Sequence, residues 1–508
     1  MSLSLVFSRA GGLEAPLVTV EVLLTNGLPS LGIVGLPETA VKESKDRVRG
    51  AIINSQFDFP VRRITINLAP ADLPKEGGRF DLAIALGILL SSDQLDLSKS
   101  QLPQQQGFIE QFEFVGELAL SGELRAVKGI LPIAIQAKKN NRILIVPEQN
   151  GVEAALVNDL KVLTARHLLD VCAFLKGEKE LSEAETQNAV KYNGYSTCFS
   201  DIRGQQSAKR ALEIAAAGQH SLIMKGPPGT GKTMLASRLV TILPDMDNVE
   251  SEEVAVIRSV CGETVDYNNW SVRGFRVPHH TASGVALVGG GSYPRPGEIS
   301  LAHHGVLFLD EVPEFSRSVL EVLREPLESG KIIISRAAKQ AEFPASFQLI
   351  AAMNPCPCGY YGDSNNNCRC TSEQVQRYQN KLSGPFLDRI DMHIEVPALS
   401  HKELQESSDL IETSTEVKHR VIQAQQRQNK RRNHCNAHLT NKEIEDDCHL
   451  TEENQKILEK TMDKMKLSAR AYHRILKLAR TIADLDCSDN IKLHHLTESI
   501  CYRKVDFF

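Results

Sequence analysis

The chain lacks long apolar runs. The longest, such as Leu82–Leu90, end well short of the roughly eighteen residues that a helix needs to span a bilayer. The first residues, MSLSLVFSRAGGLEAP, also lack the basic start, apolar stretch and small-residue cleavage site of a signal peptide. We therefore expect no membrane segment, no signal peptide and a cytoplasmic location.

A strong charge of either sign is also missing. The chain has 58 basic and 63 acidic residues, which gives a net charge of −5. This balance does not exclude nucleic acid as a partner, because a ring or cleft needs only a local basic lining. The 11 cysteines are an odd number scattered along the chain, which favours reduced thiols over a secreted disulfide framework.

Three zones follow one another along the 508 residues, so we expect two or three domains. Short β-like runs alternate with helical patterns over residues 1–176, which predicts an α/β or α+β domain. Residues 177–197 are polar and aperiodic, as in a linker. Apolar strands and helices alternate again over 198–397, whereas 398–508 is charged and mostly helical. The predicted fold class is a multidomain α/β chain with a helical C-terminal domain.

The stretch MKGPPGTGKTMLASRL contains a glycine loop of the pattern Gly, four residues, Gly, Lys, Ser/Thr, between an apolar run and an amphipathic segment. Backbone N–H groups of such a loop surround a β-phosphate, the lysine reaches the β/γ oxygens, and the threonine hydroxyl binds Mg²⁺. A tight glycine turn without a ligand is the alternative, which this context disfavours. We predict that ATP contacts the loop residues Gly226, Pro227, Pro228, Gly229, Thr230, Gly231, Lys232 and Thr233.

A second motif, GVLFLDE (305–311), has two carboxylates after a buried strand. Asp310 is predicted to hold Mg²⁺ through water, and Glu311 to polarise the water that attacks the γ-phosphate. An Asp-Glu pair after an apolar run is common by chance. The Asp-Glu pair is informative here because it follows the glycine loop within the same α/β zone.

Four polar residues further along have candidate roles at the phosphates. Asn354 ends an apolar strand and is predicted to sense the γ-phosphate; a cap on the chain reversal before Pro355 is the alternative. Arg389, in SGPFLDRID, is predicted to be an arginine finger, with a local salt bridge as the alternative. Arg470 and Arg474 lie one helical turn apart in SARAYHRILKLAR, and we expect Arg470 to grip a phosphate.

Together, GPPGTGKT, FLDE, AAMNP, GPFLDRID and the helical tail resemble an AAA+ ATPase of the Mg-chelatase-like branch. The stretch HHTASGVALVGGGSYPRPGEISLAHHGVLFLDEVPEF is similar to the signature of the ComM/YifB family, and the similarity extends over the whole chain. The resemblance implies an ATP-driven hexameric ring, in which Arg389 acts on the neighbouring subunit's site and the helical lid provides a second sensor.

Two segments between the motifs have the character of hairpins. Residues 283–296, SGVALVGGGSYPRP, are glycine-rich and include Arg295; residues 331–345, KIIISRAAKQAEFPA, form a β-like run, a basic tip with Arg336 and Lys339, and a return. In the resembling branch, which includes replicative MCM helicases, insertions at helix 2 and before sensor 1 line the central channel and contact the DNA backbone. Surface loops that only connect are the alternative.

Two clusters in this zone contain residue types that bind metals. The segment CPCGYYGDSNNNCRC, within residues 355–371, cannot bury a core of its own, and four thiolates would close a tetrahedral structural zinc site. A redox or iron–sulfur site and unliganded thiols are alternatives. We expect this loop to buttress the subunit interface or to reach for DNA. We expect the paired His279 and His280 to be structural, with metal ligands or catalytic groups as the alternative. The predicted zinc ligands are Cys356, Cys358, Cys368 and Cys370.

The front zone resembles the proteolytic domain of Lon-type proteases in PKEGGRFDLAIALGIL, VGELALSGELRAVKGILPIA and LIVPEQN. That family uses a Ser-Lys pair, and the resemblance assigns Arg79 to the serine position and Leu131 to the lysine position. Neither side chain can do this chemistry, so we expect a Lon-like fold without peptidase activity. Lys75 and Arg79 are candidate phosphate contacts, but we favour a solvated loop for both.

The resemblance also implies a function. We expect a DNA translocase or helicase that moves branches during recombination of DNA taken up in natural transformation, with ATP, Mg²⁺ and Zn²⁺ as cofactors. Expected partners are single-stranded, double-stranded and branched DNA, further copies of the chain in a homo-hexamer, and recombination proteins. The alternative is a Mg-chelatase-like motor or remodelling chaperone that acts on a protein; basic hairpin residues favour DNA, whereas aromatic pore tips would favour polypeptide.

Overall fold

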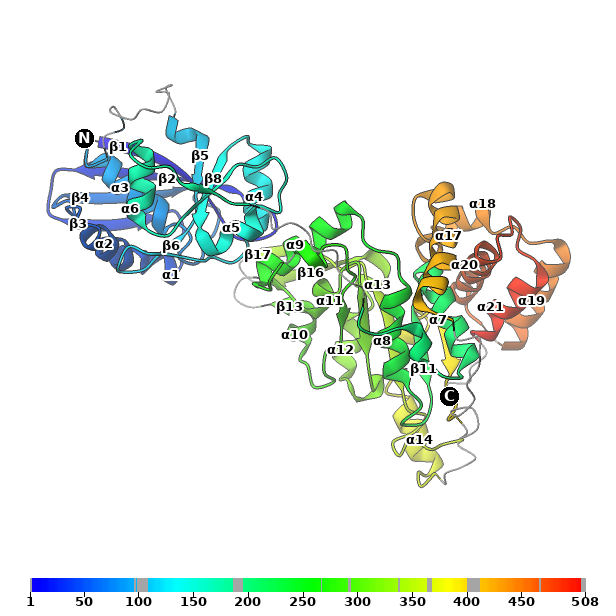
Figure 1. Cartoon of the computed structure of the whole chain (residues 1–508). Helices are drawn as coiled ribbons and strands as arrows, with labels where there is room; N and C mark the ends of the chain where they lie inside the picture. The colour runs from blue at the N-terminus through cyan, green and yellow to red at the C-terminus, as the bar shows by residue number, and fades with distance from the viewer. Residues whose placement is uncertain are drawn as a thin grey trace. The chain divides into compact units, whose positions relative to one another are not determined.

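The computed structural model describes residues 2–95, 97, 108–185, 195–265, 267–290, 294–336, 339–362, 368–399, 412–465 and 467–503. The chain forms two compact units, whose helices and strands are labelled in Figure 1. We refer to Met1–Tyr192 with Glu252–Trp270 as the N-terminal unit, and to Asn193–Ser251 with Ser271–Phe508 as the C-terminal unit.

The N-terminal unit contains two four-stranded sheets, of order β1-β2-β4-β3 and β10-β9-β8-β5, and a short β6–β7 hairpin. Its strands are β1 (Ser2–Arg9), β2 (Leu17–Thr25), β3 (Ser30–Val34), β4 (Arg63–Ala69), β5 (Phe112–Phe114), β6 (Glu117–Leu118), β7 (Leu124–Arg125), β8 (Ile143–Pro147), β9 (Val162–Ala165) and β10 (Ser182–Glu183). Its helices are α1 (Thr39–Lys42), α2 (Ser44–Asn54), α3 (Asp81–Ser91), α4 (Ile130–Lys139), α5 (Glu148–Ala154) and α6 (Leu168–Leu175).

The core of the N-terminal unit follows from a two-residue period in its strands. In β2, every second residue from Val18 to Leu24 is buried, because alternate side chains of a strand point to the same face. That face packs on α3, which also contacts β1 and α2 and is buried along almost its whole length. The apolar run Leu82–Leu90 is therefore a core helix.

Two segments belong to the N-terminal unit although the sequence indicated otherwise. Part of the range 177–197, expected to be a linker, forms β10, which pairs antiparallel with β9; residues 186–194 lie outside the described part of the chain. Helix α9 (Asn248–Cys261) begins within the range assigned to the nucleotide-binding core, but from Glu252 onward it belongs to the N-terminal unit. Its Ala255 packs with Leu131, because both present apolar side chains that neither could bury alone.

The C-terminal unit is built on a five-stranded parallel sheet of order β12-β15-β18-β11-β19. Its strands are β11 (Leu222–Lys225), β12 (Phe275–Arg276), β13 (Gly289–Gly290), β14 (Arg295–Pro296), β15 (Val306–Leu309), β16 (Lys331–Arg336), β17 (Lys339–Pro344), β18 (Gln348–Met353) and β19 (Met392–Glu395). Its core helices are α7 (Gln206–Gly218), α8 (Lys232–Ile242), α10 (Gly284–Val288), α11 (Glu298–Leu301), α12 (Arg317–Val322), α13 (Pro326–Ser329), α14 (Ser372–Gln379) and α15 (Gly384–Leu387). Every residue of β11, β15 and β18 is buried, as in a sheet covered on both faces.

The C-terminal helices pack onto this sheet unit through α7. They are α17 (Ser414–Arg432), α18 (Asn441–Asp447), α19 (Glu452–Met465), α20 (Ala469–Leu485) and α21 (Leu493–Cys501), and Figure 1 shows α17 and α20 beside α7. Thr413 and Thr440 begin α17 and α18 with capping boxes, in which a glutamate three residues on returns the hydrogen bond.

Glutamine side chains hold the helical lid against the last turn of α7. The amides of Gln425 and Gln428 donate to the carbonyl oxygens of Ala216 and Ala217, at 2.9 and 3.0 Å. The last carbonyls of a helix have no partner within the helix, so a buried helix end needs donors of this kind. The register of α17 on the sheet unit is set by these bonds.

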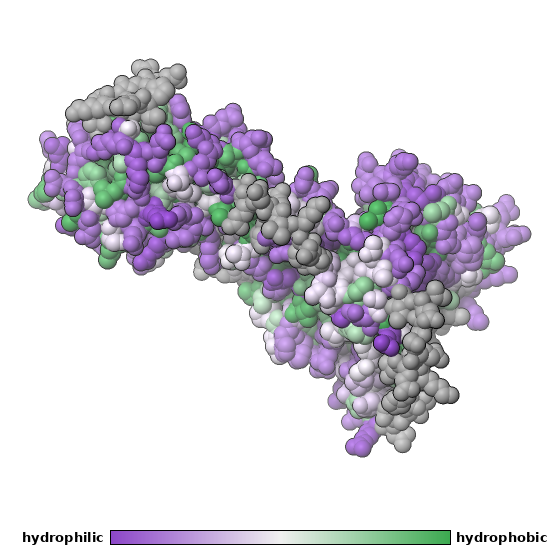
Figure 2. Space-filling view, viewed as in Figure 1, coloured by the Kyte–Doolittle hydropathy of each residue, from purple (hydrophilic) through white to green (hydrophobic). Residues whose placement is uncertain are grey.

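Hydrophilic residues cover most of the face seen in Figure 2, with hydrophobic residues scattered among them. Among the described residues, none of the helices combines the length and the apolar character that crossing a membrane requires.

Leu131 offers a test of the packing in the N-terminal unit. It is fully buried with Leu156 and Ala255, and the single tryptophan, Trp270, packs against this cluster. We expect Leu131→Ala to lower the free energy of unfolding by about 3 kcal/mol, because it leaves a cavity. Urea denaturation followed by the fluorescence of Trp270 measures this loss.

The matched control is Leu120→Ala, since Leu120 is 59% exposed. It should change the free energy of unfolding by less than about 0.5 kcal/mol. Equal urea midpoints for the two variants would contradict the assigned burial of Leu131.

Candidate nucleotide-binding site

Three motifs meet at one edge of the parallel sheet. The glycine loop follows β11, Asn354 follows β18, and Asp310 follows β15. Because β18 lies between β15 and β11 and all three run parallel, their carboxyl ends lie next to one another. Ligands of open α/β sheets bind outside the carboxyl ends of the strands. The structure therefore brings the predicted phosphate, magnesium and sensor residues to one place.

The glycine loop has a backbone that side chains would obstruct. Gly229 and Gly231 have φ angles of +78° and +85°, in the left-handed region that favours glycine. A Cβ on Gly226 would lie 2.2 Å from the carbonyl oxygen of Val396. Gly231 is also the residue before α8, so the loop ends at a helix N-terminus, which favours anions.

The ammonium of Lys232 lies inside this loop. Its Nζ donates to the carbonyl oxygens of Gly226 and Pro227, both at 2.7 Å, and to Oδ1 of Asn354 at 3.2 Å. Burial lowers the pKa of Lys232, and two nearby carboxylates oppose that shift. A phosphate bound in the loop would replace these carbonyl oxygens as the acceptor of the Lys232 ammonium. It would then lie next to the side-chain amide of Asn354.

The two predicted magnesium ligands are in direct contact. The hydroxyl of Thr233, in the first turn of α8, donates to Oδ2 of Asp310, which follows β15, at 2.8 Å. Hydroxyl and carboxylate oxygens are ligands that Mg²⁺ accepts while it keeps several waters. These residues fit a magnesium ion bound together with a nucleotide.

Glu311 has a strained backbone and an open carboxylate. Its φ of 51° and ψ of 46° are left-handed, which is uncommon for a residue with a side chain and is often found at functional sites. Its side chain is 50% exposed, and one carboxylate oxygen lies 3.6 Å from Nδ1 of His280. His280 was predicted to be structural, with a metal-ligating or catalytic role as the alternative, and no local pattern indicated that it lies beside Glu311.

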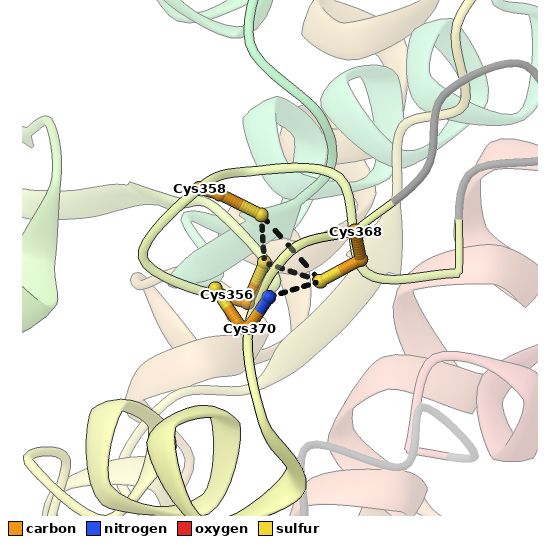
Figure 3. A group of neighbouring side chains, drawn as sticks. All are labelled: Cys356, Cys358, Cys368 and Cys370. Atoms are coloured by element: carbon orange, nitrogen blue, oxygen red, sulfur yellow. Dashed lines mark hydrogen bonds between the residues drawn. The ribbon is translucent and has the colours of Figure 1, made fainter.

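The four cysteines of the loop after β18 converge, as Figure 3 shows. Their sulfur atoms all lie within 4.8 Å of one another, and three of the Sγ–Sγ distances are 3.3, 3.5 and 3.6 Å. Four thiolates at 2.3 Å from a tetrahedral zinc ion would be separated by about 3.8 Å. Backbone N–H groups of Tyr360 and Arg369 donate to Cys358 and lower its pKa, whereas burial and the neighbouring thiols outweigh the backbone N–H of Cys370 and raise the pKa of Cys368. The cluster therefore fits zinc in both chemistry and geometry.

This cysteine loop packs against the glycine loop. A Cβ on Gly359, whose φ is +86°, would lie 2.6 Å from Cδ of Pro228. On its other side, the amide of Gln379 donates to the carbonyl oxygen of Pro355 at 3.1 Å. The loop that carries the cysteines thus supports the nucleotide site, a contact that no spacing in the sequence indicated.

Arg389 is held within its own chain. Its side chain is 6% exposed, one Nη lies 2.8 Å from Oε1 of Glu328, and the other donates to the carbonyl oxygen of Pro385 at 2.7 Å. The local salt bridge that was the alternative for this residue is therefore present in the single chain, although its partner is Glu328 and not either of the adjacent aspartates.

Arg470 and Arg474 differ in their surroundings. Arg474 forms an ion pair with Asp391, a buried carboxylate that also accepts hydrogen bonds from Ser221. Burial by itself would raise the pKa of Asp391, but Arg474 and these bonds hold it well below its ordinary value. Arg470 is 59% exposed and lies 3.9 Å from Glu328. Arg474 is thus occupied by a structural pair, and Arg470 is the more available of the two.

All three arginines lie at the edge of the sheet opposite the glycine loop. β11 and β19 are parallel with Leu222 opposite Met392, so Arg389 and Asp391 lie beside the start of β11, while the loop follows its end. A strand of this length separates the two edges by about 13 Å. The structure does not bring Arg389 or Arg470 to the phosphate site of the same chain.

Two antiparallel hairpins occur where basic hairpins were expected. β13 pairs with β14, on which Arg295 is exposed. β16 pairs with β17 over six residues each, and Arg336 lies opposite Lys339 at the closing end. The side chains of Arg336 and Lys339, and residues 291–293 and 337–338, lie outside the described part of the structure.

The N-terminal unit has no Ser-Lys pair at the positions that the Lon resemblance assigned. Leu131 is fully buried in an apolar cluster, and Arg79 donates from Nε to the carbonyl oxygen of Glu76 at 3.3 Å. Lys75 corrects an expectation: it is fully buried with its ammonium on the carbonyl oxygen of Pro70, and burial lowers its pKa. It is therefore not an accessible phosphate contact.

Three family models match the chain. They are described as "Magnesium chelatase, subunit ChlI" over residues 198–404, "Subunit ChlI of Mg-chelatase" over residues 20–150, and "Magnesium chelatase, subunit ChlI C-terminal" over residues 411–503.

Similar proteins extend this finding over the full length. "Competence protein ComM" of Haemophilus influenzae is 54% identical over 508 residues, covering 99% of this chain and 98% of the relative. "Uncharacterized protein YifB" of Escherichia coli is 51% identical over 507 residues, covering 100% of this chain and 98% of the relative. "Lon protease 2" of Bacillus subtilis is 28% identical over 182 residues, 31% of this chain and 33% of the relative.

Two substitutions separate nucleotide binding from turnover at this site. We expect Lys232→Ala to abolish ATP binding, because no other ammonium of the described residues lies inside the loop. Glu311→Gln should retain ATP binding but slow hydrolysis by at least about 100-fold, because the amide cannot accept the proton of the attacking water. Binding of a fluorescent nucleotide and release of phosphate measure the two effects.

Glu314→Gln is the matched control, since Glu314 lies three residues away, is 43% exposed and pairs with Lys381. It should hydrolyse ATP at close to the normal rate. Unchanged hydrolysis by the Glu311→Gln protein would remove the catalytic assignment.

Proposed function

This chain belongs to the ComM/YifB family, whose members are Mg-chelatase-like AAA+ proteins, and on that premise we propose that it is an ATP-dependent DNA translocase that promotes branch migration. The process served is homologous recombination of DNA taken up in natural transformation. Family membership itself predicts ATPase activity that uses ATP and Mg²⁺.

Each residue of the nucleotide site has a part in the hydrolysis step. The loop N–H groups and Lys232 bind the β- and γ-phosphates, and Thr233 and Asp310 hold Mg²⁺. Glu311 accepts the proton of the attacking water, and Asn354, which already contacts Lys232, aligns that water with the γ-phosphate. Arg389 and Arg470, which lie at the other edge of the sheet, do not donate to the γ-phosphate of their own chain.

The observation that carries the proposal is the position of the arginines. Arg389 and Arg470 lie at the opposite edge of the sheet from their own glycine loop, so they can reach phosphate only in another copy. A site completed by the neighbour in this head-to-tail manner generates a closed ring when the rotation between copies closes. We propose a hexamer, in which Arg389 is the finger and Arg470 the second sensor of the adjacent subunit's site.

The basic hairpins support DNA as the substrate of this motor. Arg295 is exposed on β14, and Arg336 and Lys339 are paired at the closing end of the β16–β17 hairpin. Guanidinium and ammonium groups at these places would contact phosphate regardless of base sequence. The competence name of the Haemophilus relative supports recombination of incoming DNA as the setting.

We also propose that Cys356, Cys358, Cys368 and Cys370 bind structural zinc. With four protein ligands the ion has no free position, so it would supply folding energy and no catalysis. Because Gly359 of this loop packs on Pro228, zinc would hold one wall of the glycine loop in place.

The motor proposal predicts that DNA controls ATP hydrolysis. Branched DNA should raise the rate of ATP hydrolysis at low salt, and the gain should fall at least about tenfold between 50 and 200 mM salt, since phosphate contacts release counterions. The double variant Arg336→Ala, Lys339→Ala should lose most of the gain. Steady-state hydrolysis with and without a synthetic branched duplex measures it.

The matched control is Lys456→Ala, Lys460→Ala, because both lysines are exposed on α19 and lie one helical turn apart. This double variant should retain the increase in ATP hydrolysis that branched DNA causes. No stimulation by branched DNA at low salt would refute the DNA proposal, and stimulation by a protein partner in its place would favour a remodelling motor.

The zinc proposal predicts about one zinc ion per chain, as one tetrahedral site requires. Cys368→Ser should reduce the zinc content to near zero, whereas Cys487→Ser, at an exposed cysteine outside the cluster, should leave it unchanged. Metal analysis of the purified proteins by mass spectrometry measures the content. A wild-type protein purified without chelator that contains no zinc would end this proposal.

A further inference from the structure

Glu328 lies between the two arginines proposed to act on a neighbour's phosphate. Its Oε1 is 2.8 Å from an Nη of Arg389 and 3.9 Å from an Nη of Arg470. The carboxylate is 48% exposed, whereas Arg389 beneath it is 6% exposed. A half-exposed anion therefore covers a buried cation.

Two other arginines at this edge have carboxylate partners of their own. Arg474 is bound to Asp391, and Arg324 is bound to Glu321, which also accepts a hydrogen bond from Ser383. Glu328 is thus the one described carboxylate that serves both remaining arginines. Nε of Arg389 is buried and has no hydrogen-bond partner among the described residues, so this guanidinium has capacity for a further acceptor.

Glu328 also lies at the base of the longer hairpin. It belongs to α13, which ends at Gly330, and β16 begins at Lys331. Gly330 ties both sides of the hairpin base: its N–H donates to Pro326 at 2.9 Å, and its carbonyl oxygen accepts from Ala345 at 2.8 Å. A displacement of Glu328 is therefore transmitted to the start of β16 through two residues of backbone.

We propose that Glu328 is a positioning residue that occupies the place of the neighbour's γ-phosphate, and that its displacement by that phosphate moves the base of the β16–β17 hairpin. This inference rests on the proposed ring of ATPase subunits. A phosphate has more charge and more acceptor oxygens than a carboxylate, so it competes for the same guanidinium donors. Repulsion between phosphate and carboxylate then drives Glu328 and α13 away.

Two consequences distinguish this role from a simple salt bridge. In the absence of DNA, Glu328 keeps Arg389 and Arg470 occupied and so slows hydrolysis at the seam. When DNA shifts the hairpin, the base of β16 moves, Glu328 is withdrawn and the arginines are released. Glu328 therefore makes hydrolysis dependent on DNA.

The test is Glu328→Gln in the full-length protein, because the amide oxygen still accepts a hydrogen bond from Arg389 while the charge is lost. We expect the DNA-free rate of ATP hydrolysis to rise about fivefold to tenfold, because a neutral amide binds the Arg389 guanidinium more weakly than a carboxylate and is displaced more easily. The ratio of the rates with and without branched DNA should fall to about one. Glu328→Gln combined with Arg389→Ala should lose the raised rate, since the released group is then missing.

Glu148→Gln is the matched control, because Glu148 is 50% exposed and pairs with Arg166 at 2.7 Å in the N-terminal unit. It should change neither the DNA-free rate nor the ratio. A melting temperature that falls for Glu328→Gln with both rates unchanged would overturn the inference and leave an ordinary salt bridge.

A different measurement shows whether the proposed function fails. If branched DNA does not stimulate the wild-type protein, the DNA proposal fails, and the DNA-free rate of Glu328→Gln alone decides this inference. A raised rate supports the role of Glu328 as a stand-in for phosphate, and an unchanged rate overturns it.

Discussion

The parallel register of β11 and β19 is the constraint on which the rest of the structure depends. Because Leu222 lies opposite Met392, the residues that precede β19 lie beside the start of β11, and the glycine loop lies beyond its end. The phosphate-binding loop therefore lies at one edge of the sheet, and Arg389 and Arg470, the arginines proposed to assist hydrolysis, lie at the opposite edge. Under the proposed function, chemistry that needs both is shared between two copies, and assembly is a condition of catalysis.

Charged side chains at both edges are held by partners that a nucleotide would replace. At the carboxyl edge, Lys232 donates to loop carbonyls, and Thr233 donates to Asp310. At the other edge, Glu328 serves Arg389 and Arg470. Leaving a buried charge without a partner is costly, so these contacts preserve the site in the absence of ligand. ATP has to displace these same contacts when it binds. Their displacement is how nucleotide binding at one edge of the sheet can affect the other edge.

Leu131 shows how packing determines a position to which the Lon resemblance assigns a lysine. Leu131 is fully buried there, and it packs with Ala255 from α9, a helix that begins in the other unit's sequence range. An ammonium at this place would be desolvated without a partner, whereas leucine contributes to the core. The described environment of Leu131 thus fits a packing role.

The sequence by itself determined the local features of this protein. The glycine loop, the buried strands with their terminal Asp310 and Asn354, and the helical character of the C-terminal region were all predicted, because each depends on residues that are close along the chain. Only the tertiary structure decided that Arg470 is more exposed than Arg474, that Arg389 pairs with Glu328, that His280 lies beside Glu311, and that the cysteine loop supports Pro228. These contacts join residues far apart in sequence, so no local period or spacing encodes them, and they exist only once the parallel sheet has brought its strands together.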